Sequence, residues 1–129
     1  MKEYGIEQIR NIALVGQGNS GKTTMAEAMA LCMGIINRTG SVDAGNTLSD
    51  FSPDENERKI SISAAMLNGN WSGTKVNIID VPGYSDFLGE CRGALRAADT
   101  AVLVMDALSG VEVGIEQAWR TADEQRLPT

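Results

Sequence analysis

Histidine is absent from all 129 residues of this chain, so the commonest general base of enzymes is missing. Cysteine is nearly absent, with Cys32 and Cys91 as the only two. Both fall in segments where the pattern predicts helices, and we interpret them as reduced thiols packed as small hydrophobic side chains. This usage argues against a disulfide or a metal centre built on cysteine.

Basic residues are outnumbered, with 11 Lys and Arg against 17 Asp and Glu and a net charge of -6. Because nucleic-acid phosphates are bound by clustered Lys and Arg, this balance argues against direct nucleic-acid binding by the chain. No apolar run approaches the ~20 residues that a membrane span needs, so we expect no membrane partner. The start, MKEYGIEQIR, lacks the apolar core of a signal peptide, which predicts a cytoplasmic protein.

Residues 16–23, GQGNSGKT, fit the phosphate-binding pattern G-x-x-x-x-G-K-[ST], the P-loop. The pattern predicts a buried strand at 11–15 before it and a helix at 24–33 after it, ending at Gly34. In such a unit the N–H groups of the loop form an anion site at the helix N-terminus. The alternative is a plain glycine-rich turn.

The residue types in this loop match that chemistry. Lys22 supplies a positive charge for the β- and γ-phosphates, and the Thr23 hydroxyl is placed to hold Mg²⁺. Glycines allow backbone conformations that a Cβ would disfavour, and the loop has three of them, Gly16, Gly18 and Gly21.

Residues 35–59 show no periodicity and are rich in Gly, Ser, Asn and charge. A loop of this length is uncommon in a compact domain unless it is functional or disordered. Behind a P-loop it can be a switch that senses the γ-phosphate, and the alternative is a solvated linker. The composition alone leaves both interpretations open.

An antiparallel hairpin is predicted next. Residues 59–67 alternate through Ile60 and Ile62 as an edge strand would, and residues 74–81 form the partner strand. Residues 68–70, Asn-Gly-Asn, supply turn chemistry, and 71–73 complete the connection.

Asp80 ends the second of these strands, and Pro82 and Gly83 follow. A carboxylate at a strand end beside a P-loop is expected to support Mg²⁺. Gly83 would let its backbone N–H approach a γ-phosphate. Taken alone the segment is an ordinary strand-to-turn ending, but behind a P-loop we favour the functional interpretation.

The remaining pattern alternates helices and strands. Residues 85–86 can cap a helix, 100–107 read as a buried strand, and 109–110 make a turn before a helix at 111–125. Residues 127–129 look like the lead into another strand. The side chains expected to face the core are Met25, Met29 and Met33 in the first helix, Phe87, Cys91, Ala94, Leu95 and Ala98 in the second, and Val111, Ile115, Ala118, Trp119 and Ala122 in the third.

This alternation predicts an α/β fold of three layers, with a mostly parallel sheet that the hairpin makes mixed. The length and the 43% of apolar residues allow one folded domain.

Four stretches together resemble a translational GTPase, more closely the start of elongation factor G or an elongation-factor-G-like protein. They cover nearly the whole chain in order and are GQGNSGKTT, DFSPDENERKISISAA, NIIDVPGYSDFLGE and ALRAADTAVLVMDALSGVEVGIEQAW. The resemblance implies a P-loop NTPase fold with the P-loop at 16–23, switch one at about 35–63 and switch two at about 80–90. It also implies binding of GTP or GDP with Mg²⁺, GTP hydrolysis, and action on the ribosome through the full-length protein.

Site residues follow from the same resemblance. Residues of the loop and the following helix would bind the phosphates: Gly18, Asn19, Ser20, Gly21, Lys22, Thr23 and Thr24. The metal would be held by Thr23, Ser61 and Asp80. The hydrolytic step would involve Lys22, Gly83 and Tyr84.

Three positions depart from the family's usual residues. Lys59 stands where the family has Gly, although Ser61 keeps the hydroxyl that would reach Mg²⁺. Tyr84 replaces the His that positions the attacking water, and a phenol with a pKa near 10 is no general base at neutral pH, though its O–H can orient a water. Asn19 replaces an Asp, and its side chain either binds a monovalent cation near the phosphates or caps the loop.

The family's guanine-reading motif, Asn-Lys-x-Asp, is expected a few residues after Thr129 and is absent. The chain therefore looks like an N-terminal fragment of the domain, and nothing in it selects guanine over adenine. Without the next strand, the strand at 100–107 would have an apolar unpaired edge, which predicts self-association. Three hypotheses follow: a GTP-hydrolysing translation factor, a non-hydrolysing nucleotide-dependent binder, and a P-loop ATPase of another family.

Overall fold

The computed structural model describes residues 3–49, 54, 57, 61–83 and 88–129. Helices and strands alternate through these residues. The elements are a short 3-10 helix at Ile6–Gln8, β1 at Ile9–Val15, α1 at Lys22–Cys32, β2 at Ala65–Trp71, β3 at Thr74–Asp80, α3 at Leu88–Ala97, β4 at Thr100–Leu103 and α4 at Val113–Glu124. No helix in these ranges is both long and apolar enough to cross a membrane.

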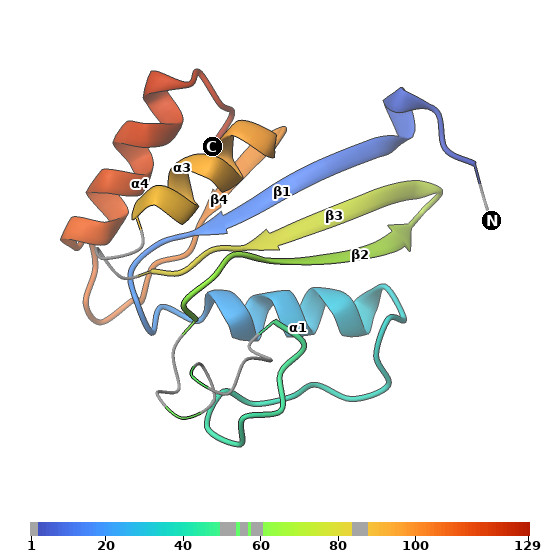
Figure 1. The fold of residues 1–129 in the computed structure, drawn as a ribbon, viewed down its shortest axis with the longest axis horizontal. Coiled ribbons are helices and arrows are strands. Elements are labelled where there is room, and N and C mark those ends of the chain that lie inside the picture. The colour runs from blue at the N-terminus through green and yellow to red at the C-terminus, as the bar shows by residue number, and fades with distance from the viewer. Residues whose placement is uncertain (1–2, 50–53, 55–56, 58–60, 84–87) are drawn as a thin grey trace.

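The four strands form one mixed sheet in the order β2-β3-β1-β4. β1 is parallel to both β3 and β4, while β2 and β3 form the antiparallel pair. Helix α1 covers one face of the sheet, and α3 and α4 cover the other (Figure 1). The predicted three-layer α/β fold with a mostly parallel sheet is confirmed.

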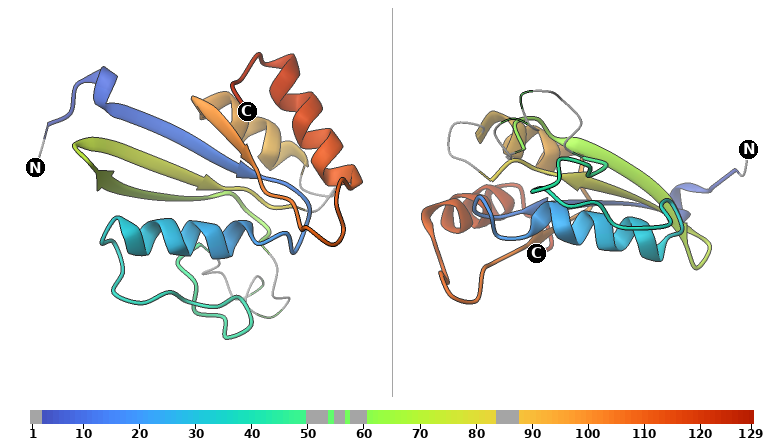
Figure 2. Two further views of the ribbon diagram at one scale, coloured as in Figure 1. Left: turned by 180° about the vertical axis from the view of Figure 1, so that it is seen from behind. Right: turned by 90° about the horizontal axis from the view of Figure 1, so that it is seen from below.

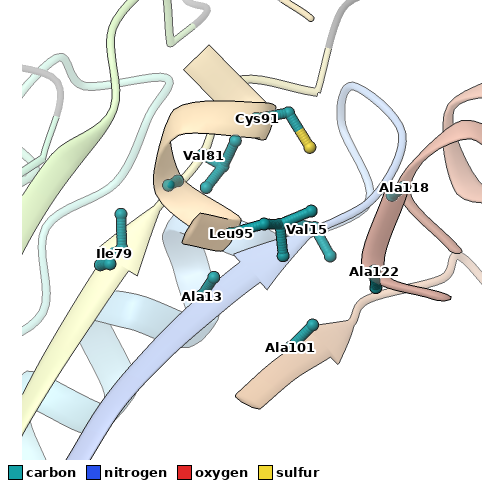
Figure 3. Packing of buried hydrophobic residues seen from close by; sticks show 10 residues of the cluster. Ala13, Val15, Ile79, Val81, Cys91, Leu95, Ala101, Ala118 and Ala122 are labelled. Atoms are coloured by element: carbon teal, nitrogen blue, oxygen red, sulfur yellow. The ribbon is translucent and has the colours of Figure 1, made fainter. Parts of the chain in front are cut away.

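Two clusters of buried side chains hold the layers together, because successive residues of a strand point to opposite faces. On one face, Leu14 and Ile78 pack with Ala26 and Ala30 of α1. On the other face, residues of the same two strands meet α3 and α4 (Figure 3). That cluster contains Ala13, Val15, Ile79, Val81, Cys91, Ala94, Leu95, Ala101, Ala118 and Ala122.

The hairpin is confirmed, but its predicted turn is wrong. Residues 68–70 lie within β2, with Asn68 opposite Asn77, and the chain reverses at Ser72 and Gly73. Both turn residues have positive φ, 48° and 85°, the backbone twist that suits a two-residue hairpin turn. The strand also starts at Ala65 rather than 59, and the predicted Ile60 lies outside the described residues.

The helix faces expected to meet the core mostly do so, since Ile115, Ala118, Ala122, Met29 and Met33 pack there, but single predicted positions are wrong. Val111 and Trp119 were predicted to face the core but are 67% and 57% exposed, while Ile115, Ala118 and Ala122 are buried. Trp119 follows Ala118 by one residue, which rotates its side chain by about 100° from the buried stripe. In α1 the same effect exposes Met25, and the small Ala26 takes the core position.

β4 is shorter than predicted and lies at the edge of the sheet among the described strands. Beyond it the last residues of the chain run alongside. The Ala101 N–H and the Thr100 hydroxyl both donate to the Pro128 carbonyl, at 2.8 and 2.9 Å. The edge predicted to be unpaired is therefore partly covered by the chain's own C-terminal residues.

Candidate phosphate and metal site

The carboxyl ends of β1 and β3 lie side by side at one edge of the sheet, where the register sets Leu14 opposite Asp80. The loop 16–21 leaves β1 at this edge and enters α1, as all three views show (Figures 1 and 2). The parallel pairing therefore brings the loop, the start of α1 and Asp80 to one place. In parallel α/β sheets this edge is where ligands bind.

The N-terminus of α1 is open to an anion. Gly21 is its N-cap, with φ 94°, and within the described part of the chain no side chain caps it and no acidic residue lies in the first turn. The first N–H groups of a helix have no partner inside the helix and carry partial positive charge. They are thus placed to bind phosphate oxygens.

The glycine prediction is partly wrong. Gly16 and Gly21 have positive φ, but Gly18 is not among the positive-φ residues, and the third left-handed position of the loop falls on Asn19, with φ 62°. Asparagine tolerates this conformation better than most residues. Asn19 is accordingly a turn residue of the loop, whatever its side chain binds.

Lys22 lies buried under the loop, and its Nζ donates to the Gln17 carbonyl at 2.6 Å. Burial lowers the pKa of Lys22 below its ordinary value because it disfavours the charged form, and the nearby Asp80 carboxylate opposes this. The Cys91 thiol lies within electrostatic reach, and burial raises its pKa. The Lys22 ammonium group is held against the loop by the Gln17 carbonyl.

Thr23, Asp80 and Ser61 converge from three parts of the sequence. Thr23 Oγ1 donates to Asp80 Oδ2 at 2.8 Å, and Ser61 Oγ lies 3.3 Å from the same Thr23 oxygen. Donation to Asp80 leaves the lone pairs of the Thr23 oxygen for a cation. Two hydroxyls and a carboxylate are the hard oxygen ligands that Mg²⁺ prefers, so the residues fit this metal.

Gly83 approaches the loop so closely that a side chain would not fit. A Cβ built on Gly83 would collide with the Lys22 ammonium group and would lie 2.6 Å from the Gln17 carbonyl carbon. The segment that follows β3 thus packs directly on the P-loop.

In the part of the chain that the structure describes, the side chains of two other predicted site residues, Ser20 and Thr24, make no hydrogen bond to the group formed by Thr23, Ser61 and Asp80. Ser20 Oγ has no hydrogen-bond partner among the described residues and lies under the loop, 3.2 Å from the position of a Cβ at Gly16. Thr24 is exposed on α1, so any phosphate contact would use its backbone. Tyr84, predicted to position water, lies outside the described residues, as do the capping residues 85–86 and Phe87.

Two contacts were missed by sequence reasoning. Gln17 Oε1 accepts a hydrogen bond from Gly114 N at 2.9 Å, which ties the loop to the start of α4. Glu27 is buried and accepts two backbone N–H groups from the segment after α1. Gln17 is a variable position of the motif and gave no signal, whereas an acidic residue among the apolar positions of α1 could have marked Glu27.

Comparison with known proteins gives consistent matches. The family model described as the elongation factor Tu GTP binding domain matches residues 7–129. Elongation factor G of Petrotoga mobilis is 43% identical over 130 residues, which cover 99% of this chain and 19% of that protein. The mitochondrial ribosome-releasing factor 2 of Scheffersomyces stipitis is 38% identical over 128 residues, covering 99% of this chain and 15% of that protein.

A solved structure of a protein from Thermus thermophilus has a TM-score of 0.91 and 41% sequence identity to this chain. The match covers 94% of this chain and 18% of that one. The chain therefore spans less than a fifth of the length of these relatives.

Proposed function

Because the chain belongs to the family of elongation factor Tu GTP binding domains, we propose that it binds and hydrolyses GTP as the N-terminal portion of such a domain. Its parts would be the P-loop at 16–23, switch one at about 35–63 and switch two at about 80–90. The whole protein would be a translation factor that acts on the ribosome, in line with the names of its relatives. The cytoplasmic location stays a prediction from the sequence.

The observation that carries this proposal is the contact of Thr23 with both Asp80 and Ser61. These residues lie 57 and 38 positions from Thr23 in the sequence, yet their oxygens meet at the start of α1. A hydroxyl that only stabilises the fold needs a single hydrogen-bond partner, whereas Thr23 Oγ1 has two oxygen neighbours. Three oxygen ligands, from the buried Thr23 and Asp80 and the half-buried Ser61, beside an uncapped helix N-terminus support a site for Mg²⁺ and phosphate.

Each residue then has a separate role. The N–H groups of residues 18–24 would bind the phosphate oxygens, and Lys22 would neutralise charge on the β- and γ-phosphates. Thr23, Ser61 and Asp80 would hold Mg²⁺, which when bound supplies positive charge that stabilises the phosphoryl group during transfer. The Gly83 backbone would contact the γ-phosphate, and the Tyr84 O–H would orient the attacking water. A monovalent cation beside Asn19 remains a proposal of the same kind.

Ribosome-stimulated hydrolysis tests the proposal. The full-length protein should hydrolyse GTP with ribosomes and only slowly without them, because Tyr84 offers no general base at neutral pH. Unstimulated turnover near ~10 s⁻¹, a typical enzyme rate, would contradict the slow intrinsic step. Nucleotide competition separates GTP from ATP, and preference for ATP would favour a P-loop ATPase.

A second function is favoured by one observation, the Tyr at position 84 in a chain with no histidine. In this alternative the protein binds GTP on the ribosome without hydrolysing it. Binding of guanine nucleotide with no hydrolysis in the presence of ribosomes would establish the alternative.

A further inference from the structure

Glu27 is a buried carboxylate outside the phosphate and metal site. It lies on α1 one helical turn beyond Thr23 and is only 2% exposed. Its Oε2 accepts the Gly40 N–H at 2.7 Å, and its Oε1 accepts the Leu48 N–H at 2.5 Å. Both oxygens are used by backbone groups, so this carboxylate acts on the segment after α1 rather than on a cation.

The segment 40–48 that Glu27 binds is a closed unit. The Ser41 N–H donates to Asn46 Oδ1 at 2.8 Å, and the Asn46 N–H returns to the Ser41 carbonyl at 3.4 Å. A Cβ on Gly40 would collide with the Asn46 carbonyl, so the two ends of the unit touch through their backbones. The loop that contains this unit lies on the side of α1 away from the sheet (Figures 1 and 2).

Two positions of the predicted switch one are therefore tied to the same helix. Leu48 is bound at Glu27, and Ser61 lies against Thr23, one turn closer to the phosphate loop. Residues four apart in a helix share a face, so the two attachment points are neighbours. Glu27 thus fixes where the chain leading to Ser61 begins.

We propose that Glu27 is a positioning residue that favours delivery of Ser61 to the metal site by anchoring residues 40–48 on α1. The proposal rests on the proposed function and deepens it, because Ser61 would hold Mg²⁺ in the triphosphate state. Without the anchor, the chain to Ser61 would start at the end of α1, near Gly34, instead of at Leu48. The loop that must close to bring Ser61 to Thr23 is then roughly twice as long, which lowers the probability of its closure about threefold.

The test compares nucleotide affinities of Glu27→Gln with those of the unchanged full-length protein. The amide keeps the shape but replaces one acceptor oxygen with an NH₂ group that cannot accept an N–H. We expect affinity for a non-hydrolysable GTP analogue to fall about threefold or more, while affinity for GDP changes less than about twofold. Glu116→Gln is the matched control, since it makes the same charge change at an exposed position of α4 and should alter neither affinity.

A merely structural role for Glu27 would lower thermal stability and weaken both nucleotides equally, and that result would overturn the proposal. If Glu27→Gln does not fold, hydrogen exchange of the unchanged protein decides. The Gly40 and Leu48 amides should be protected equally with GDP and with the GTP analogue, and fast exchange of both would refute the anchor. Failure of the unchanged protein to bind either nucleotide would instead refute the proposed function.

Discussion

Replacing Gly83 with Ala tests the close packing of the segment after β3 on the P-loop. The added Cβ would collide with the Lys22 ammonium group, which can move, but also with backbone atoms of the loop, which cannot move independently. Overpacking of this kind costs about 1–3 kcal/mol. The effect is local to the site, and it is a substantial fraction of the ordinary stability of a domain, about 5–15 kcal/mol.

The free energy of unfolding of the nucleotide-free protein should fall by about 1–3 kcal/mol, as measured by guanidinium denaturation. If the Gly83 backbone contacts the γ-phosphate, its displacement would lose that contact, and affinity for a GTP analogue should fall about fivefold or more, which corresponds to ~1 kcal/mol. Affinity for GDP, which lacks that phosphate, should change much less.

Gly93→Ala is the control for this change. A Cβ at Gly93 meets no heavy atom within 4 Å, and the residue lies inside α3. Alanine is favoured over glycine in a helix by up to ~1 kcal/mol, so this variant should be slightly more stable. The reasoning is refuted if Gly83→Ala is as stable as Gly93→Ala and keeps its preference between the two nucleotides.

Three further predictions can be checked with simple assays. Lys22→Ala should remove nucleotide binding by the full-length protein, and retained affinity would refute the P-loop assignment. Because burial lowers the pKa of Lys22, its charge destabilises the nucleotide-free fold at neutral pH, and this penalty shrinks as the pH rises towards 10.5. Lys22→Met should therefore raise the melting temperature of the nucleotide-free protein at pH 7. Iodoacetamide should label the exposed Cys32 much faster than the buried Cys91, whose pKa is raised, and equal labelling rates would contradict the packing of α3. The isolated chain should self-associate through the part of the β4 edge that the C-terminal residues leave uncovered, and a monomer at high concentration in light scattering would count against this.

The order of the elements could be predicted because local signals agree with the sheet they build. The P-loop pattern, the apolar strand before it and the Asp80 strand end each specify their own part, and the register sets Leu14 opposite Asp80 as parallel pairing requires. The convergence of Thr23 with Ser61 and Asp80 then follows from the shared edge of the sheet.

The sequence-based predictions were wrong where two local structures suit the same residues nearly equally well. Asn68–Gly69–Asn70 has good turn chemistry, yet Ser72 and Gly73 form the turn, because the longer pairing keeps Leu67 buried opposite Ile78. Trp119 was expected in the core from its spacing in the helix, but Ala118, one residue earlier, and Ala122 take the buried positions. Glu27 could have been noticed as an acidic residue among the apolar positions of α1, but its partners could not, since they are backbone groups that carry no residue signature.

The most direct test of the central claim is a calorimetric titration of GDP and GTP, with and without Mg²⁺, into the full-length protein and its Asp80→Asn variant. The account predicts that Mg²⁺ strengthens nucleotide binding to the unchanged protein and that most of this gain is lost in the variant. The reason is that the amide lacks the negative charge of the Asp80 carboxylate, which accepts the Thr23 hydrogen bond and would attract the metal. Equal nucleotide affinities of the two proteins, or affinities that do not change when Mg²⁺ is added, would contradict the assignment of Thr23, Ser61 and Asp80 as a metal site.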